Sequence, residues 1–322
     1  MAELDTFQLE ILDRLSDISP GEWNALLPQD AGPFLRHEFL SALEETSCVG
    51  GNTGWQVAHL VLKQDGQLIG AIPLYLKQHS YGEFVFDWSW AQAYEQQGMN
   101  YYPKALCAIP FTPVQGSRIL CSPESDAVEI QNALIGGLKT VLAENHLSSV
   151  HILFPMANQA KVLKEQGFLL RDSVQFHWHN QDFQSFEEFL SALTMKRRKN
   201  IRREREQVAK EAITFRHVPG KESSDQDWEF FFDCYQNTYL EHNSAPYLNE
   251  SFFKLWAKRM PDNLHLIIAE KDGMSIAASL LVIDRPSGKV FGRYWGAKVH
   301  IPCLHFEAAY YQAIEYCIAE GI

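Results

Sequence analysis

Residues 59–76 read HLVLKQDGQLIGAIPLYL, two runs of strand-forming residues separated by Asp65-Gly66. An Asp-Gly pair readily adopts the left-handed backbone that a two-residue hairpin turn requires, so this stretch predicts a β-hairpin. The strands are expected at residues 59–62 and 68–76. Residues 84–90 are predicted to form the next strand.

The same order of strand, Asp-Gly turn and strand recurs at residues 265–284, HLIIAEKDGMSIAASLLVID. The Asp-Gly pairs lie 207 positions apart, and each hairpin is followed by a similar segment, VFDWSW from Val85 and VFGRYW from Val290. Solenoid repeats are far shorter, so two copies of one domain are indicated. We predict an α/β (α+β) protein of two tandem domains, residues 1–182 and 183–322, each with a mixed sheet flanked by helices.

Helices and further strands follow from capping signals and periodicity. Ser19-Pro20-Gly21-Glu22 combines an N-cap serine, a proline at the first helical position and a capping-box glutamate, which predicts a helix start. The other expected helices are residues up to about 45, 127–144, 159–166, 228–239, 251–260 and 306–320, with strands at 149–154 and 174–178. The second copy stops after its last helix, so we expect it to be incomplete.

Composition limits the functional classes. The chain has 322 residues, a formal net charge of -12 and 46% apolar residues, which is typical of a globular protein and disfavours general attraction to DNA. Its six cysteines show no metal-binding spacing, so reduced thiols and no metal site are expected. The acidic N-terminus precedes no apolar signal region, and no run of 18 apolar residues occurs; a cytoplasmic protein without a transmembrane segment is expected.

One basic segment contrasts with this acidic background. MKRRKNIRREREQVAKE, residues 195–211, predicts a helix, and residues 196–205 hold seven cations and one glutamate. Helical periodicity places Arg197, Arg198 and Arg205 near the apolar stripe of Ile201 and Val208, and Arg202 farther away. The outward residues Lys196, Lys199 and Arg203 are expected to serve solubility.

The motifs resemble a known family. LTMKRRKNIRREREQVAKEAITFRHV, residues 193–218, resembles the opening of the second domain in FemABX-type transferases, with Arg198 and Ile201 at the matching positions. FFDCYQNTY and HFEAAYYQAIEYCIAEG fit the same family in order, and the first half resembles the FemAB-like branch of peptidoglycan biosynthesis or recognition proteins. The resemblance implies tandem GNAT-like domains and transfer of an acyl or aminoacyl group to an amine.

The resemblance leaves the acyl donor open. GNAT enzymes bind the pyrophosphate of acetyl-CoA on a glycine-rich turn at a helix start, where backbone N–H groups suit an anion. This chain has WGAKVHIPCLHFEAA there, with Pro302 and bulky residues in place of the glycines. The sequence therefore does not support acetyl-CoA, although the fold permits it. An acyl-CoA, another carrier-bound acyl group or an aminoacyl-tRNA stays open as donor, and no cofactor is assigned.

Two groups of candidate site residues emerge. Lys77, His79 and Asp87 are ionisable residues near one predicted strand end, where they could bind an anionic acceptor or remove a proton from its amine. Residues expected to bind substrate are Tyr81, Trp88, Trp90, Arg197, Arg198, Arg202, Arg205, Arg293, His305 and Glu307. Arg198, supported by the neighbouring arginines, is expected to face the cleft between the halves and to bind phosphate.

The sequence thus predicts a FemABX-like N-acyltransferase whose acceptor bears phosphate, such as a nucleotide-linked or lipid-linked peptidoglycan precursor. Direct attack by an amine on an activated ester needs positioning and one proton acceptor, and no metal. Two alternatives stay open: an acetyl-CoA-dependent GNAT acetyltransferase, and a non-catalytic module that binds tRNA or a cell-wall precursor through the basic helix. The oligomeric state is not predicted.

Overall fold

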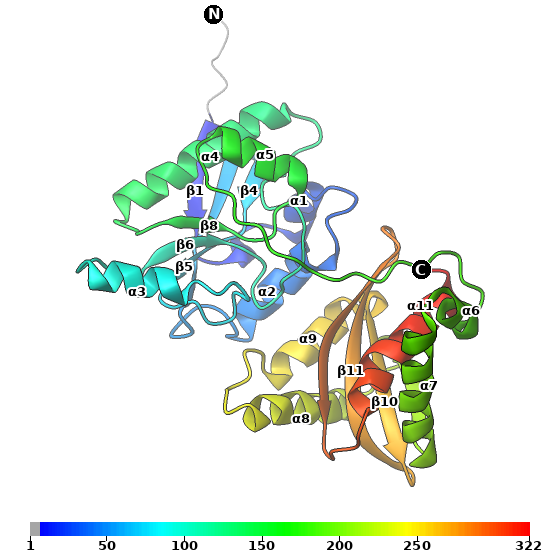
Figure 1. The fold of residues 1–322 in the computed structure, drawn as a ribbon. Coiled ribbons are helices and arrows are strands. Elements are labelled where there is room, and N and C mark those ends of the chain that lie inside the picture. Colours follow the sequence, from blue (N-terminus) through cyan, green and yellow to red (C-terminus); the bar gives the residue numbers. More distant parts are fainter. Residues whose placement is uncertain (1–6) are drawn as a thin grey trace, which may run out of the picture. The chain divides into compact units, whose positions relative to one another are not determined.

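The computed structural model describes residues 7–322 and divides the chain into two compact units, Met1–Ser173 and Val174–Ile322 (Figure 1). Each unit is an α/β structure with its own sheets and flanking helices, which confirms the predicted fold class. The domain boundary proposed from the sequence, at residues 182 and 183, lies a few residues beyond the division between the units.

The first unit contains two four-stranded sheets, ordered β1-β3-β4-β7 and β2-β5-β6-β8. Neighbouring strands are antiparallel except β6 and β8, which are parallel. The strands are β1 (Phe7–Leu12), β2 (Trp55–Val57), β3 (His59–Gln64), β4 (Gln67–Ile72), β5 (Leu74–Lys77), β6 (Lys104–Cys107), β7 (Leu120–Cys121) and β8 (Val150–Ile152). The helices are α1 (Pro20–Ala25), α2 (His37–Glu45), α3 (Trp88–Gln96), α4 (Ala127–Glu144) and α5 (Ala157–Glu165), with 3₁₀ turns η1 (Leu15–Asp17) and η2 (Pro33–Leu35).

The hairpin of β3 and β4 forms as predicted. Asp65 and Gly66 both have positive φ, 50° and 81°, as the two-residue turn requires. The single strand predicted at residues 68–76 is instead two strands in different sheets, because Pro73 cannot donate a ladder hydrogen bond and interrupts the pairing. α4 packs on this hairpin through Ile130, whose side chain lies so close to Gly70 that a Cβ there would be 2.6 Å away.

Two other strand predictions are wrong. Residues 84–90 form a loop and the start of α3. The next strand along the chain after β5 is β6. Residues 174–178 form no strand. Both segments are rich in aromatic and branched residues, which favour strands, but neither pairs with a strand in this fold.

The second unit has one antiparallel sheet in the order β12-β11-β10-β9. Its strands are β9 (Thr214–Pro219), β10 (Leu264–Lys271), β11 (Met274–Asp284) and β12 (Lys289–Ala297). Asp272 and Gly273 repeat the left-handed turn of the first hairpin, with φ of 51° and 75°. Within this unit α8 and α9 lie on one side of the sheet, and α7 and α11 on the other (Figure 1).

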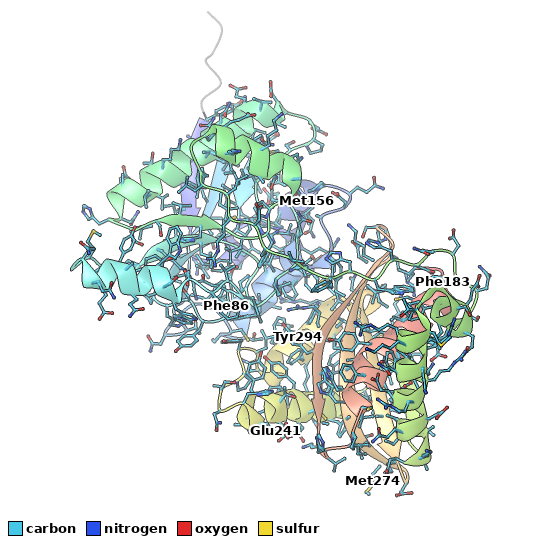
Figure 2. The ribbon with its side chains drawn as sticks, in the orientation of Figure 1. Phe86, Met156, Phe183, Glu241, Met274 and Tyr294 are labelled. Carbon is cyan, nitrogen blue, oxygen red and sulfur yellow. The ribbon has the colours of Figure 1, made fainter. Side chains whose placement is uncertain are left out.

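The helices of the second unit are α6 (Phe186–Ala192), α7 (Met195–Lys210), α8 (Asp225–Glu241), α9 (Glu250–Arg259), α10 (Leu304–Phe306) and α11 (Gln312–Glu320), with a 3₁₀ turn η3 (Pro261–Asn263). A π-helical turn, Glu307–Tyr311, joins α10 to α11. α8 approaches β12 closely, because a Cβ on Gly296 would lie 1.8 Å from the carbonyl oxygen of Cys234. Apolar side chains fill the interior of both units (Figure 2).

Candidate functional site

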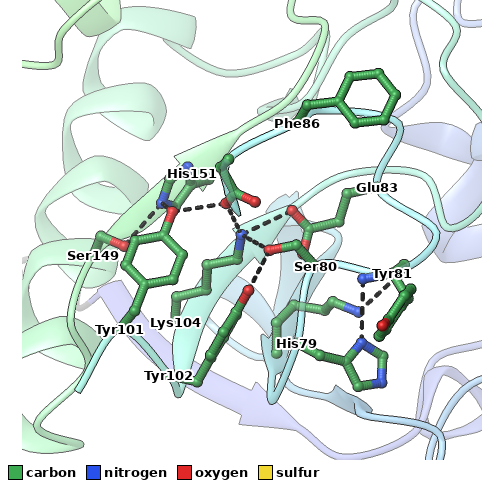
Figure 3. A network of polar contacts seen from close by, with 12 residues as sticks. His79, Ser80, Tyr81, Glu83, Phe86, Tyr101, Tyr102, Lys104, Ser149 and His151 are labelled. Atoms are coloured by element: carbon green, nitrogen blue, oxygen red, sulfur yellow. Dashed lines mark hydrogen bonds and ion pairs between the residues drawn. The ribbon is translucent and has the colours of Figure 1, made fainter. Parts of the chain in front are cut away.

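Lys77, His79 and Asp87 lie at the end of β5 and in the loop that follows it, and Lys77 interacts electrostatically with the other two. Figure 3 shows the polar contacts around this loop. Lys77 is the last residue of β5, and the loop at residues 80–87 returns over the sheet before α3 begins. The centre of the group is Lys104, the first residue of β6, which lies directly opposite Lys77 in the strand register. Sequence reasoning did not single out Lys104.

Lys104 is buried and donates three hydrogen bonds. Its Nζ lies 2.8 Å from Ser80 Oγ, 2.8 Å from Glu83 Oε2 and 2.5 Å from Asp87 Oδ2. Glu83 Oε1 and Asp87 Oδ1 are buried and have no hydrogen-bond partner among the described residues. A buried polar atom without a partner costs about 1–3 kcal/mol, so the network is only partly satisfied.

Lys77 lies in an apolar environment. Its Nζ is 3.7 Å from the ring centroid of Trp55 and donates to the carbonyl oxygen of Tyr81 at 3.2 Å. Burial lowers the pKa of Lys77 to about 7, an effect that nearby Glu83 opposes and Lys104 reinforces. An amine with this pKa is partly neutral at physiological pH and can accept a proton.

The acidic residues of the network respond in opposite ways. Burial raises the pKa of Glu83, although Lys104 opposes this change. Burial also acts to raise the pKa of Asp87, but hydrogen bonds from Lys104 and Tyr101 outweigh it and hold that pKa below its ordinary value. Tyr101 donates to Asp87 Oδ2 at 2.7 Å and also contacts His151 Nε2 at 3.3 Å. Burial lowers the pKa of His151 to about 4, so this imidazole is neutral near pH 7.

Both ring nitrogens of His79 are engaged. Nε2 contacts the carbonyl oxygen of Thr53 at 3.1 Å, and Nδ1 accepts from the backbone N–H of Tyr81 at 3.3 Å. The Tyr81 ring packs between His79 and Trp88, while Trp88 and Trp90 are half exposed on α3. The catalytic role expected for Lys77, His79 and Asp87 stays a prediction.

The basic helix α7 forms as predicted, with Thr194 as its N-cap. Arg198 is half-buried and donates to the carbonyl oxygen of Ser191 at 3.3 Å, whereas Arg197 is exposed. Arg202 pairs with Glu187 at 2.5 Å. Arg205 binds two carboxylates, Glu307 at 2.9 Å and Glu315 at 2.8 Å.

These contacts determine which arginine side chains can still donate hydrogen bonds to a ligand. Arg205 lies 4.4 Å from the centroid of the Phe186 ring. Its guanidinium donates to Glu307 in the π-helical turn and to Glu315 in α11, which links α7 to both elements. Arg202, Arg205 and Glu307 line a pocket of about 500 Å³ on this side of the unit. Arg197 and Arg198 do not line it.

A second pocket, of about 570 Å³, lies between α8 and the β12–α10 connection. Its lining includes two of the predicted binding residues, Arg293 and His305, and several aromatic side chains. Tyr294 and Glu241 on its wall are labelled in Figure 2. The ring of His305 packs on Trp295 at a centroid distance of 5.2 Å. Burial lowers the pKa of His305, so its imidazole is neutral at pH 7.

Sequence reasoning missed Lys104 and His151 as members of the network. They come from separate segments that meet only when β6 pairs with β5 and β8. A lysine at the start of an apolar run gives no signal of its own, because lysines usually lie at the surface. No group of three or more His, Cys, Asp or Glu is placed to hold a metal ion within residues 7–322.

The structure defines an α/β protein of two units, with buried ionisable groups in the first unit and a pocket lined in part by aromatic residues in the second. The chain belongs to the FemAB-like family of peptidoglycan biosynthesis/recognition proteins, whose model matches residues 14–322. The family supports an acyltransferase-type role. A sequence search of curated proteins gives no match. In the described part of the chain, no helix is both long and apolar enough to cross a membrane.

A comparison with solved structures gives two matches. A tandem GNAT protein from the clavulanic acid biosynthesis pathway, solved without AcCoA, has a TM-score of 0.43 and 10% identity, and the match covers 98% of this chain and 86% of that chain. A ribosomal-protein-alanine N-acetyltransferase from Brucella melitensis biovar Abortus 2308 has a TM-score of 0.27 and 14% identity, and the match covers 54% of this chain and 100% of that chain.

Proposed function

We propose that this chain is an N-acyltransferase that transfers an acyl or aminoacyl group to the amino group of a phosphate-bearing acceptor, with a peptidoglycan precursor as the acceptor class. Membership of the FemAB-like family supports this function. The observation that carries the chemistry is the pocket beside β12, which combines a guanidinium, a neutral imidazole and aromatic walls.

Each part of the pocket has a role in this proposal. Arg293 binds the anionic group of donor or acceptor, because a guanidinium donates two parallel hydrogen bonds to phosphate or carboxylate. The aromatic walls exclude water and hold the apolar parts of the substrate. His305 lies on the same pocket wall and is neutral, so it can accept a proton.

The reaction balances without a metal or an enzyme nucleophile. The acceptor amine attacks the carbonyl carbon of an activated ester or thioester, and a new C–N bond forms as the bond to the leaving oxygen or sulfur breaks. His305 takes the proton that the attacking nitrogen loses and returns it to the leaving group.

A comparison of two histidines in the same pocket tests the proposal. The assay measures amide formation with acyl-CoA and aminoacyl-tRNA donors and a nucleotide-linked cell-wall precursor peptide as acceptor. His305→Gln should lower kcat by about 10²–10⁴-fold, as loss of a general base does, with little change in KM. His300→Gln is the control, because His300 lines the same pocket, whereas the His305 ring packs on Trp295.

Equal losses in the two variants would contradict the role of His305. Absence of turnover with every donor, together with tight binding of the acceptor, would contradict the transferase function. That result would favour the second candidate, a non-catalytic binding module that uses α7. The observation behind this candidate is that Lys196, Arg197, Lys199 and Arg203 are exposed and make no ion pair with any described residue.

A further inference from the structure

The loop at residues 80–87 buries polar side chains and exposes aromatic ones, the reverse of an ordinary surface loop. Its buried side chains are polar: Ser80, Glu83 and Asp87. Its most exposed side chains are aromatic: Tyr81 at 57%, Phe84 at 46% and Phe86 at 76%. Figure 3 shows Phe86 pointing away from the network while Glu83 and Ser80 point into it. Because water favours the opposite arrangement, something beneath the loop must hold its carboxylates inside.

Two lysines lie beneath the loop. Lys77 and Lys104 are directly opposite each other on β5 and β6, so their side chains leave the same face of the sheet. Both are fully buried. Like charges at opposite positions destabilise a strand pair unless an anion lies between or above them. In this structure the loop supplies that negative charge with Glu83 and Asp87.

The loop leaves some carboxylate oxygens without hydrogen bonds and holds one residue in an unfavourable backbone conformation. One oxygen of each carboxylate, Glu83 Oε1 and Asp87 Oδ1, is buried without a hydrogen-bond partner among residues 7–322. Phe84 has a φ of 58°, a left-handed conformation that a bulky residue adopts only under constraint. The two carboxylates therefore neutralise the lysines without satisfying their own oxygens.

We propose that Lys77 and Lys104 form a binding site for a phosphate dianion, which the loop at residues 80–87 closes with its own carboxylates. A phosphate bound at the lysines releases Glu83 and Asp87 to water and lets Phe84 and Phe86 turn inward over the ligand. The charge balances, because one dianion replaces two carboxylates. The hydroxyl groups of Ser80 and Tyr102, 2.8 Å apart beside Lys104, are further donors for the phosphate oxygens.

This site lies in the first unit and does not depend on acyl transfer, so it goes beyond the function proposed above. The proposal predicts that the loop carboxylates and a phosphate compete for the two lysines. Replacing Glu83 by the nearly isosteric glutamine weakens the hold of the loop on Lys104, and the affinity for phosphate should rise.

The first experiment is calorimetric titration of the full chain with inorganic phosphate at pH 7. Glu83→Gln should bind about tenfold more tightly than the wild type, which corresponds to about 1.4 kcal/mol. Glu95→Gln removes one negative charge from exposed α3 in the same region and should match the wild type. Equal affinity in Glu83→Gln and Glu95→Gln would overturn the proposal.

The second experiment reads the loop directly. Hydrogen exchange of the peptide that covers residues 78–90 should change when phosphate is added to the wild type. Lys77→Met keeps the ion pairs of Lys104 and should lose both the phosphate affinity, by at least about tenfold, and the exchange response. The proposal would be contradicted if Lys77→Met bound phosphate as tightly as the wild type. It would also be contradicted if phosphate left the hydrogen exchange of residues 78–90 unchanged in the wild type.

Discussion

Lys77 and Lys104 show how much the surroundings of a single residue decide. They carry the same side chain on neighbouring strands and are both buried. Lys104 has two carboxylate partners, whereas Lys77 has an aromatic ring and a backbone carbonyl oxygen. The pKa of Lys77 is lowered to about 7, because burial disfavours its charge more than its neighbours compensate.

This difference predicts a pH dependence of stability. The unfolded chain keeps Lys77 protonated up to its ordinary pKa of 10.5, while the folded chain releases the proton near pH 7. Between these values the unfolded state binds more protons, so the free energy of unfolding should rise with pH, by up to about 1.4 kcal/mol per unit. Urea unfolding of the wild type and of Lys77→Met between pH 7 and 9 measures this change in the free energy of unfolding.

The variant isolates the effect, because every other titrating group is common to both proteins. The stability of the wild type should therefore rise relative to that of Lys77→Met as the pH increases. Parallel curves for the two proteins would show that Lys77 keeps an ordinary pKa in the folded state.

Among the elements, the segments after the two hairpins diverge most from their sequence likeness. VFGRYW lies in β12 and pairs with β11, whereas VFDWSW lies in a loop and the first turn of α3. The physical reason is Asp87, whose carboxylate binds Lys104 of β6 and holds the segment over the end of the sheet. The glycine at the matching place in β12, Gly292, has no side chain that could do this.

Helix α7 gives a prediction at the same scale. Arg198 is half-buried near Ser191, and Arg203 is exposed without an ion pair to any residue that the structure describes. If Arg198 binds phosphate, Arg198→Ala should weaken binding of a nucleoside diphosphate by about 1.5–3 kcal/mol, whereas Arg203→Ala should cost less than about 1 kcal/mol. Titrations at two salt concentrations, with folding checked by circular dichroism, compare the variants.

Salt separates the two interpretations of the helix. Equal losses for Arg198→Ala and Arg203→Ala, both vanishing at high salt, would mean a diffuse electrostatic surface and no specific phosphate site. Arg205 is unsuitable for this comparison, because its guanidinium already binds Glu307 and Glu315 and its loss would disturb the fold.

For the whole molecule, the segment at the division between the two units combines irregular backbone with exposed apolar side chains. Residues 168–182 have no helix or strand, and Leu169, Val174 and Phe176 are almost fully exposed. Limited digestion with chymotrypsin should therefore cleave first within this segment and release two folded fragments, because each unit has its own core. Mass spectrometry of the early products identifies the site.

Circular dichroism of the separated fragments completes this test. First cleavage inside β10 or α4, or unfolding of both fragments on separation, would mean that the units depend on each other for stability. The control is Met274, an exposed chymotrypsin site next to the Asp272-Gly273 turn; its strand is paired, so cleavage there should be slower.

The sequence alone was enough for features that depend on local chemistry. The two Asp-Gly hairpins, the Ser19 capping box and the bounds of α4 and α7 follow from turn residues, N-caps and periodicity, and the structure confirms them. The family resemblance, carried by motifs around α7 and α11, is confirmed by the family model.

Only the tertiary structure decided which distant groups meet. Pairing of β5 with β6 places Lys104 opposite Lys77 and under the loop that carries Glu83 and Asp87, and no local pattern encodes that register. Likewise, the sequence placed Arg205 among the residues expected to bind substrate, and the structure pairs it with Glu307 and Glu315. Local preferences act within a few residues, whereas the charge partners of a buried side chain depend on how the sheet and helices pack.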